Sequence, residues 1–428
     1  MFHFSRQGPH APLAPPIETC SILAVTQPAN IDIYDPGIYE QGVPHDAFRV
    51  LRHECPVYFQ TEPAGRGYYA ITKYEDLVRI TKDPTTFSSA RGGTNIEDYP
   101  EEDLSMIRLL MLNMDPPQHN KFRRLVSSGF TPRMISRMEE HVRVAARTII
   151  DSVAGAGECD FVGKIAAELP LQVIADLMGI PQDERHRVFD WSNRLIGFDD
   201  PEFQTSPEDA RIAAMEMWMY ANQLAEGRKG GGGTDLTSVL INATVDGEKL
   251  TEMEFDSFFL LLSVAGNETT RNLISGGMLA LIEHPEQRRR VLDDMSLLPA
   301  AVDEMLRWVS PVLYFRRTVT APVEIRGVQL QENDKVAVYY ISANRDEDIF
   351  ENPDVFDVGR SPNDHVAFGV GQHSCLGLSL ARLEIKVIFE ELLQRIPDME
   401  LTGDVRRLRS NFINGIKEMP VRFTPEAR

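Results

Sequence analysis

The chain has 428 residues, of which 43% are hydrophobic and 25% charged, the ordinary composition of a folded globular protein rather than a disordered one. Its formal net charge of −20 argues against a nucleic-acid-binding protein, because such a protein must neutralise phosphates with Lys and Arg. Length alone allows two or three domains or one large one. The cysteines stand singly, as in a reducing cytoplasm and unlike a secreted disulfide scaffold, at Cys20, Cys55, Cys159 and Cys375.

The N-terminal segment, residues 1–28, contains a proline cluster and lacks the continuous apolar stretch of a signal peptide. No run in the sequence approaches the roughly 20 apolar residues that a membrane helix needs, so we expect no membrane anchor. We therefore expect residues 1–28 to be a mobile N-terminal lead-in.

Helical periodicity dominates the middle of the chain. Apolar residues recur every four positions from Met134 to Ala146, which predicts a helix beginning near residue 133. The other predicted elements, in chain order, are strands at 56–59 and 68–71, helices at 76–82, 161–178, 183–197, 207–227, 235–243, 251–283, 285–294 and 299–308, a strand-rich stretch at 323–340 and a last long helix at 378–394. The pattern indicates a mainly α fold with small β-sheets.

A glycine-rich segment over residues 368–377 contains Cys375 and precedes the last predicted helix. Gly369 and Gly371 permit tight turns, and Gly377 lets the helix pack under a flat cofactor. A cysteine at a helix N-terminus has its thiolate stabilised by the helix dipole, so we expect a lowered pKa for Cys375. An incidental buried cysteine in a glycine-rich turn is the alternative. Zinc is excluded at this segment, since no second Cys or His lies at ligand spacing.

This segment resembles the haem-binding signature of the cytochrome P450 family. The matching residues are Phe368, Gly369, Gly371, His373, Cys375 and Gly377, and the match continues at Ala381 and Arg382. The resemblance covers roughly residues 45 to 425, with the family's motifs in their usual order. It implies a single domain over residues 29–428 with the triangular, mainly helical P450 fold around one haem b, and Cys375 as the axial ligand of the iron. It also implies contacts to the cofactor from Phe368, Gly369, Gly377 and Ala381.

A polar segment at residues 265–270 lies inside the long helix predicted over 251–283. Burying unpaired polar groups costs about 1–3 kcal/mol each, so such an insertion needs a reason. The alternatives are a solvated patch or a threonine bonded back to the preceding turn. Beside a haem, Gly266 would let the helix open locally, Thr269 would hold a water near bound oxygen, and Glu268 would relay protons from solvent. The segment resembles the acid–alcohol pair of the same family.

Glu304 and Arg307 are three residues apart, which places both on one face of a predicted helix. Most such pairs are surface ion pairs worth less than about 1 kcal/mol. Their position before Arg360 and before the cysteine segment resembles the order of motifs in the family. The resemblance implies that Glu304, Arg307 and Arg360 interlock behind the haem and serve folding and haem retention.

The two propionates of the implied haem need cationic partners, and Arg is favoured for its fork of donors. His119 and Arg123 resemble the family's His-x-x-x-Arg helix at the haem edge. Arg317 matches a strand position that usually faces a propionate, and His373 in the cysteine segment is the fourth candidate. Surface charge is the alternative for each of these residues. His365 is expected to be structural.

Together these features predict a soluble, cytoplasmic monooxygenase that inserts one atom of O₂ into an apolar small molecule. The sequence contains no flavin or iron–sulfur motif, so we expect electrons from a ferredoxin and its reductase, with docking at Lys121, Arg124 and Arg133. One alternative is a peroxide-driven fatty-acid hydroxylase on the same fold, whose members usually replace the acid–alcohol pair. The other is a non-catalytic haem sensor or carrier.

Three stretches, at residues 266–272, 342–347 and 414–417, resemble a bacterial subgroup of the family that acts on sterols, branched lipids and terpenoids. The candidate substrate contacts are Gly92, Ile96, Ile196, Phe198, Leu262, Ala265, Val312, Leu313 and Tyr314.

Overall fold

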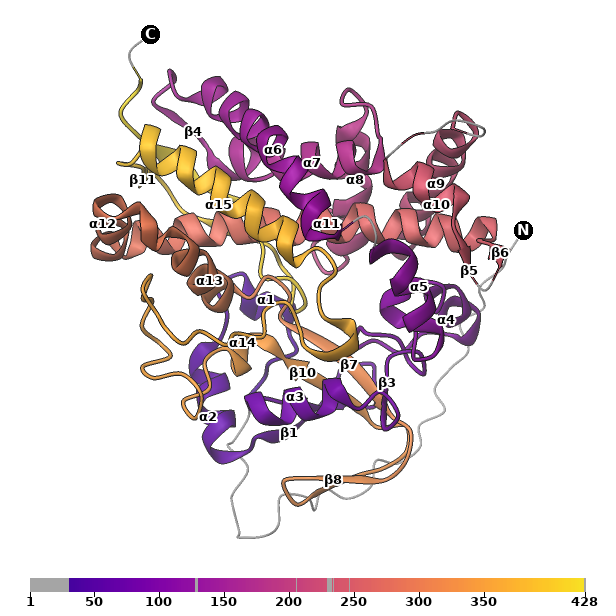
Figure 1. Cartoon of the computed structure of the whole chain (residues 1–428). Helices are drawn as coiled ribbons and strands as arrows, with labels where there is room; N and C mark the ends of the chain where they lie inside the picture. The colour runs from indigo at the N-terminus through magenta and orange to yellow at the C-terminus, as the bar shows by residue number, and fades with distance from the viewer. Residues whose placement is uncertain are drawn as a thin grey trace.

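A computed structural model of the chain describes residues 31–127, 130–204, 206–228, 233, 235–245 and 247–426. The expected lead-in over residues 1–28 lies outside them. Figure 1 shows one long helix, α11, crossing the middle of the molecule, with other helices on one side and the largest sheet on the other. The expected mainly α fold with small sheets is therefore confirmed.

Helices and short strands alternate along the described chain. The α-helices are α1 Pro36–Tyr39, α2 His45–Glu54, α3 Tyr74–Lys82, α4 Glu101–Ile107, α5 Gln118–Ser127, α6 Pro132–Val153, α7 Glu168–Met178, α8 Arg185–Ile196, α9 Pro207–Glu226, α10 Leu236–Asn242, α11 Glu252–Glu283, α12 Pro285–Asp293, α13 Leu298–Val309, α14 Tyr340–Ala343 and α15 Leu378–Arg395. The strands are β1 Val57–Gln60, β2 Tyr68–Ile71, β3 Phe87–Ser88, β4 Glu158–Asp160, β5 Thr244–Val245, β6 Glu248–Lys249, β7 Tyr314–Val319, β8 Val323–Ile325, β9 Val328–Leu330, β10 Lys335–Tyr339, β11 Glu400–Leu401, β12 Arg406–Arg407, β13 Ile416–Glu418 and β14 Pro420–Arg422.

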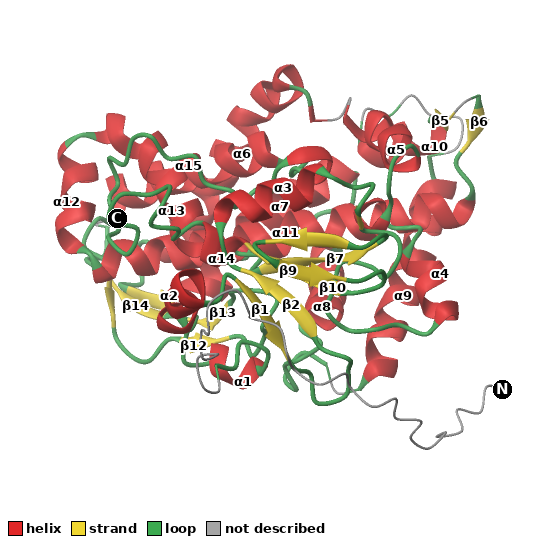
Figure 2. Ribbon diagram, turned by 90° about the horizontal axis from the view of Figure 1, so that it is seen from below, coloured by secondary structure: helices red, strands yellow, loops and turns green. Residues whose placement is uncertain are grey.

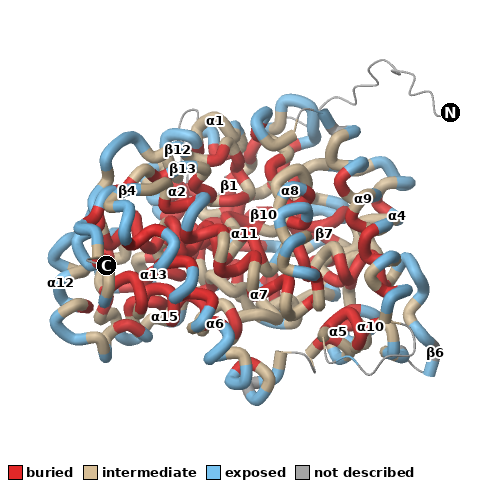
Figure 3. The backbone as a smooth tube through the Cα atoms, turned by 90° about the horizontal axis from the view of Figure 1, so that it is seen from above, coloured by how far each residue is buried: buried red, intermediate tan, exposed pale blue. Residues whose placement is uncertain are grey.

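Helix α11 organises the core. Thr251 and Glu254 form a reciprocal capping box at its start, which satisfies amide donors that a helix leaves unpaired at that end. Buried residues lie on nearly every side of this helix, as expected for a helix enclosed by others. It packs against α7, α8, α9, α13 and α15. Figure 3 shows its course through the buried centre of the molecule.

The largest sheet in the described part of the chain has the strand order β1-β2-β10-β7-β3 (Figure 2). Strand β10 is buried at every position, and β7 pairs with it antiparallel, with Arg317 opposite Val336 and Arg316 opposite Ala337. Because successive side chains of a strand point to opposite faces, Arg316 and Arg317 act on different sides of this sheet.

The predicted boundaries hold to within a few residues for most long elements. Strand β1 is shifted by one residue and α3 begins at Tyr74, two residues earlier than expected. The helix expected over 161–178 is divided, because residues Val162–Ala166 form a π-helical turn before α7. Among the described residues, no helix has both the length and the apolar character needed to cross a bilayer.

Candidate functional site

The loop that carries Cys375 is shaped by its glycines. Gly369 and Gly371 have φ angles of +66° and +76°, in the left-handed region that favours glycine, which confirms the expected tight turns. A Cβ atom on Gly371 would lie 2.8 Å from the Thr81 carbonyl oxygen, so the loop also passes close to α3. The Cys375 amide donates to the Phe368 carbonyl at 2.8 Å, which closes the loop.

The residues after the cysteine begin α15. Gly377 is its N-cap, and a Cβ atom there would meet only the edge of the Phe130 ring, at 4.0 Å. Ala381, one turn further on, is half-buried and packs against the main hydrophobic core. The Arg382 guanidinium lies 5.0 Å from the centre of the Phe368 ring, so the loop and the helix contact each other through these two side chains.

Burial raises the pKa of the Cys375 thiol, so the expected lowering of this pKa is not found. The Gly377 amide donates to the sulfur, and Arg123 and Arg382 also favour the thiolate, but these contributions are smaller than the cost of desolvation. Cys375 lies two residues before Gly377, the N-cap of α15.

Four basic side chains converge beside this loop. His119 is 1% exposed and its ring lies 4.1 Å from the ring of His373. Arg123 donates to the Ser374 hydroxyl at 3.4 Å, and Arg317, 3% exposed, donates only to a main-chain carbonyl. Burial, followed by the charge of Arg317, lowers the pKa of His373 to about 2. Within the described part of the chain, neither Arg123 nor Arg317 forms an ion pair with a carboxylate, so this cluster has an excess of donors.

The polar segment of α11 is helical throughout, so the expected local opening at Gly266 is wrong. A Cβ atom at Gly266 would lie 2.8 Å from Cδ1 of Ile174, so the end of that side chain would have to move to admit a larger residue between α11 and α7. The Thr269 hydroxyl donates to the Ala265 carbonyl at 3.0 Å, which is the back-bonded arrangement expected as an alternative.

Glu268 is 1% exposed and pairs with Arg271 one turn later on the same helix. Burial raises the pKa of Glu268, while Arg271 opposes that rise. Arg271 also donates to the Asn193 side chain of α8 at 3.0 Å. Arg271 was not predicted from the sequence, although its spacing of three from Glu268 is a recognisable ion-pair signal. The Oε1 atom of Glu268 has no hydrogen-bond partner among the described residues.

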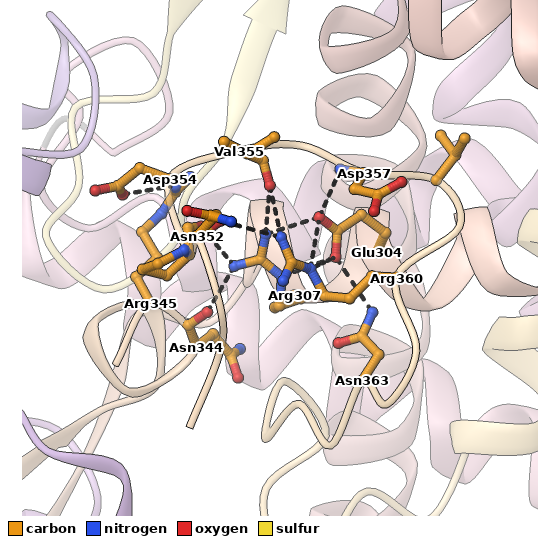
Figure 4. A network of polar contacts seen from close by, with 12 residues as sticks. Glu304, Arg307, Asn344, Arg345, Asn352, Asp354, Val355, Asp357, Arg360 and Asn363 are labelled. Atoms are coloured by element: carbon orange, nitrogen blue, oxygen red, sulfur yellow. Dashed lines mark hydrogen bonds and ion pairs between the residues drawn. The ribbon is translucent and has the colours of Figure 1, made fainter. Parts of the chain in front are cut away.

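Glu304, Arg307 and Arg360 form one network (Figure 4). The Glu304 carboxylate accepts from Arg307 at 2.7 and 2.8 Å and from Arg360 at 3.1 and 3.2 Å. It also accepts from the Asp357 amide at 2.9 Å and the Asn363 side chain at 3.2 Å. Glu304 and Arg307 are both fully buried, so this pair is not a surface ion pair.

The substrate contacts expected from the sequence fall into different environments. Ile96, Leu313 and Tyr314 are fully buried within a hydrophobic cluster that includes Phe48 and Tyr339. The remaining candidates are the buried Gly92 and Leu262, the half-buried Ile196, Phe198 and Val312, and the exposed Ala265. The structure therefore brings some of these residues into one cluster and leaves others apart from it.

The loop at residues 95–97 is held by two buried cations that were not predicted from the sequence. Arg316 donates to the carbonyl oxygens of residues 95, 96 and 97 at 3.4, 3.1 and 2.8 Å. Lys335 donates to the Ile96 carbonyl at 3.0 Å and pairs with Glu62 at 2.5 Å. These bonds fix the main chain of a loop that contains a candidate substrate contact.

Comparison with known proteins identifies the family. The model of the family "Cytochrome P450" matches residues 170–397. The chain is 42% identical over 406 residues to a steroid C26-monooxygenase of Rhodococcus jostii, covering 92% of this chain and 85% of that protein. It is 43% identical over 396 residues to a methyl-branched lipid omega-hydroxylase of Mycobacterium tuberculosis, covering 90% and 92%. The chain belongs to the cytochrome P450 family.

Solved structures agree with this assignment. A Mycobacterium marinum cytochrome P450 in complex with pseudoionone superposes on this P450 with a TM-score of 0.87 and 37% sequence identity, covering 94% of this chain and all of that one. A Bacillus megaterium P450 in complex with testosterone gives a TM-score of 0.80 at 31% identity, covering 89% and 97%. This P450 is therefore a haem-dependent monooxygenase by family.

Members of the family bind haem b, and the residues of this P450 fit that cofactor. A haem brings two carboxylates, and the unpaired guanidinium of Arg317 and the crowded donors of His119, Arg123 and His373 need such anions. The loop also provides one thiol, Cys375, toward which the Gly377 amide donates. Buried cations without carboxylate partners are costly on their own, so this cluster is consistent with an anionic cofactor.

Proposed function

We propose that this P450 hydroxylates the end of a methyl-branched apolar chain, on a sterol or a branched lipid, with residues 29–428 acting as one domain. The observation that carries the proposal is the basic cluster around the Cys375 loop, in a chain more than two-fifths identical to enzymes named for such substrates. When bound, the haem would supply the redox centre at which O₂ is activated.

In this proposal the Cys375 sulfur would hold the haem iron. The Gly377 amide and the charges of Arg123 and Arg382 favour the thiolate form that a metal requires. Arg123, Arg317, His119 and His373 would hold the propionates, with Phe368, Gly369, Gly377 and Ala381 lining the cofactor's cysteine side. The network of Glu304, Arg307 and Arg360 would keep the loop segment before the cysteine in place.

The cysteine assignment has a direct test. The reduced, CO-bound spectrum of the wild type should show the red-shifted band of thiolate ligation, and Cys375→Ser should lose that band. The matched control is Cys159→Ser, which removes another free thiol and should leave the spectrum unchanged. An unaltered spectrum in Cys375→Ser would refute the assignment.

Glu268 and Thr269 are the proposed proton-delivery groups. Burial lets the Glu268 carboxyl hold a proton more readily than an exposed one, and its free Oε1 can accept or pass that proton. The Thr269 hydroxyl, next in the sequence, would be the second group of this helix to hold that proton. Thr269→Ala should keep substrate binding but divert reducing equivalents to peroxide, whereas full coupling in this variant would refute the proton-delivery role of Thr269.

The substrate proposal rests on the named relatives, which oxidise steroids and methyl-branched lipids. The test is a panel of sterols, branched lipids and terpenoids, scored by the low-to-high-spin shift of the haem and then by product analysis. Branched compounds should shift the spin state, and their straight-chain counterparts should do so more weakly. Preferential turnover of straight-chain fatty acids with H₂O₂, without a reductase, would instead support the peroxide-driven alternative.

We further propose that electrons come from a ferredoxin in the cytoplasm. Lys121, Arg124 and Arg133 lie on α5 and the start of α6, and α5 contacts the cysteine loop through Arg123. Arg124 and Arg133 are exposed, so an acidic partner can reach them. The double variant Arg124→Glu/Arg133→Glu should slow reduction by ferredoxin and leave reduction by dithionite unchanged. Equal ferredoxin reduction rates would exclude this docking patch.

A further inference from the structure

A cavity lies away from the cysteine loop. It has a volume of about 430 Å³ and is bounded by α2, the C-terminal parts of α11 and α13, and the β12–β13 hairpin. Its lining contains none of the residues proposed to hold haem, deliver protons or contact substrate. Part of its wall is apolar, formed by Leu279, Ala280, Trp308, Val309 and Ile416. The volume lies within the range of roughly 300–1,000 Å³ seen for small-molecule sites.

Several donors that line this cavity have no partner. Arg345 is 3% exposed, and its Nε is buried without a hydrogen bond. Its guanidinium stacks 3.9 Å from the centre of the Trp308 ring, while another nitrogen pairs with Asp354 at 3.2 Å. The buried Nδ1 of His45 also lacks a partner. Burial lowers the pKa of Arg407 and the charge of Glu283 opposes that lowering, while within the described residues the Arg407 side chain forms no hydrogen bond or ion pair.

The charges of the cavity are unevenly distributed. Its acidic residues lie at the exposed rim, with side chains of Asp46 and Asp354 that are 86% and 47% exposed and a Glu283 that is also exposed. Asp46 is already paired with Arg49 at 2.7 Å. At the floor, burial and then neighbouring positive charge hold the pKa of His45 well below its ordinary value. The contributing arginines are Arg345, Arg52, Arg407 and Arg307. Of these four arginines, Arg52, Arg307 and Arg345 pair with Glu347, Glu304 and Asp354, so Arg407 is the one among them without a carboxylate partner in the described residues.

We propose that this cavity binds a small organic carboxylate. The carboxylate would accept from the Arg407 guanidinium, and the apolar body would pack along the wall formed by α11 and α13. An anion with two oxygens suits the fork of donors on a guanidinium. Arg345 and Asp354 adjoin the Glu304 network in Figure 4, so a bound carboxylate would also stabilise the segment that this network holds.

The test uses the holoenzyme with an azole bound to the haem iron, so that the probe cannot occupy the distal side. Isothermal titration calorimetry with benzoate should give saturable binding, and Arg407→Gln should weaken it by roughly tenfold or more, the loss expected for a charge-assisted contact. The matched control is Arg406→Gln, which removes the preceding arginine of the same strand. Arg406 is paired with Glu202 and Glu418 rather than facing the cavity.

Benzyl alcohol, which has nearly the same shape as benzoate without the charge, should bind much more weakly. Because Arg407 has no hydrogen-bonded partner among the described residues, Arg407→Gln should keep the wild-type CO-bound spectrum and unfolding midpoint, so a lost binding signal would not reflect misfolding. The proposal is overturned if the wild type shows no saturable binding of benzoate. It is equally overturned if Arg407→Gln binds benzoate as tightly as the wild type, or if benzyl alcohol binds as tightly as benzoate.

Discussion

Replacing Glu304 with glutamine tests whether the buried network of Figure 4 carries a large share of the fold's stability. The carboxylate accepts from two arginines, a main-chain amide and an asparagine. A glutamine offers one acceptor oxygen and turns an NH₂ group toward donors of Arg307 or Arg360. Arg307 is fully buried, so Glu304→Gln leaves a charge that is no longer neutralised.

Removing one partner of a buried ion pair typically costs about 3–5 kcal/mol, and we expect Glu304→Gln to lose that much free energy of unfolding. Arg307 keeps its bonds to the carbonyls of Asn344, Pro353 and Val355, which limits the collapse of the segment. Equilibrium unfolding in urea, followed by circular dichroism and by haem absorbance, measures the loss.

The control for this experiment is Asp46→Asn, which breaks a pair of the same spacing at the surface, where Arg49 lies 2.7 Å away. That pair should be worth less than about 1 kcal/mol. If Glu304→Gln were no more destabilising than Asp46→Asn, burial of the network would not matter energetically and the reasoning would be refuted.

Three further outcomes are expected. Gly371→Ala should lose about 1–3 kcal/mol more free energy of unfolding than Gly247→Ala. Both glycines have positive φ, but only a Cβ atom at Gly371 would meet a neighbouring carbonyl oxygen. Equal losses of free energy in urea unfolding would contradict this. Burial raises the pKa of Asp256 from 3.8 to about 6, so its charge destabilises the fold as pH rises through that interval. The gain in Tm of Asp256→Asn over the wild type should therefore grow between those pH values and then level off, and a gap independent of pH would disprove the effect. Arg316→Lys should weaken spin-shift binding of substrate by about five- to thirtyfold while keeping the CO-bound spectrum, since one or two hydrogen bonds of about 1 kcal/mol each are lost from the loop at residues 95–97. Unchanged affinity would show that the hold of Arg316 on this loop does not matter for substrate binding.

The parts of the site that lie close together in the sequence were predictable. The loop turns at Gly369 and Gly371 follow from glycine's freedom at positive φ, and the helix around Glu268 follows from its apolar flanks. The contact between Arg271 and Asn193 spans 78 residues and depends on how two helices meet, which no local pattern encodes. The hydrogen bonds from Arg316 to the loop at residues 95–97 also join distant parts of the sequence, so no local pattern predicts them.

Two helices that were not predicted from the sequence, α2 and α4, lack a clear start signal. Helix α2 begins after Pro44 and α4 after Pro100, and neither has a side-chain cap on its first turn. Without a Ser, Thr, Asp or Asn at the N-cap, the strongest local marker of a helix start is missing. The π-helical turn before α7 is hidden for a different reason, because a change of one residue per turn leaves the apolar pattern almost unaltered.

Two neighbouring arginines of strand β7, Arg316 and Arg317, contact different parts of the protein. Arg316 faces the loop at residues 95–97, and Arg317 faces the cluster that includes His373. Since the strand's side chains alternate, inserting or deleting one residue just before this pair would move both guanidiniums at once. An insertion would put Arg316 in the place of Arg317 and leave the loop at residues 95–97 without its arginine, and a deletion would put Arg317 in the place of Arg316 and leave the cofactor region without a cation. Substitutions in this strand can therefore keep both contacts, whereas a change of its length by one residue loses one of them. The same restriction applies to sequences designed on this scaffold.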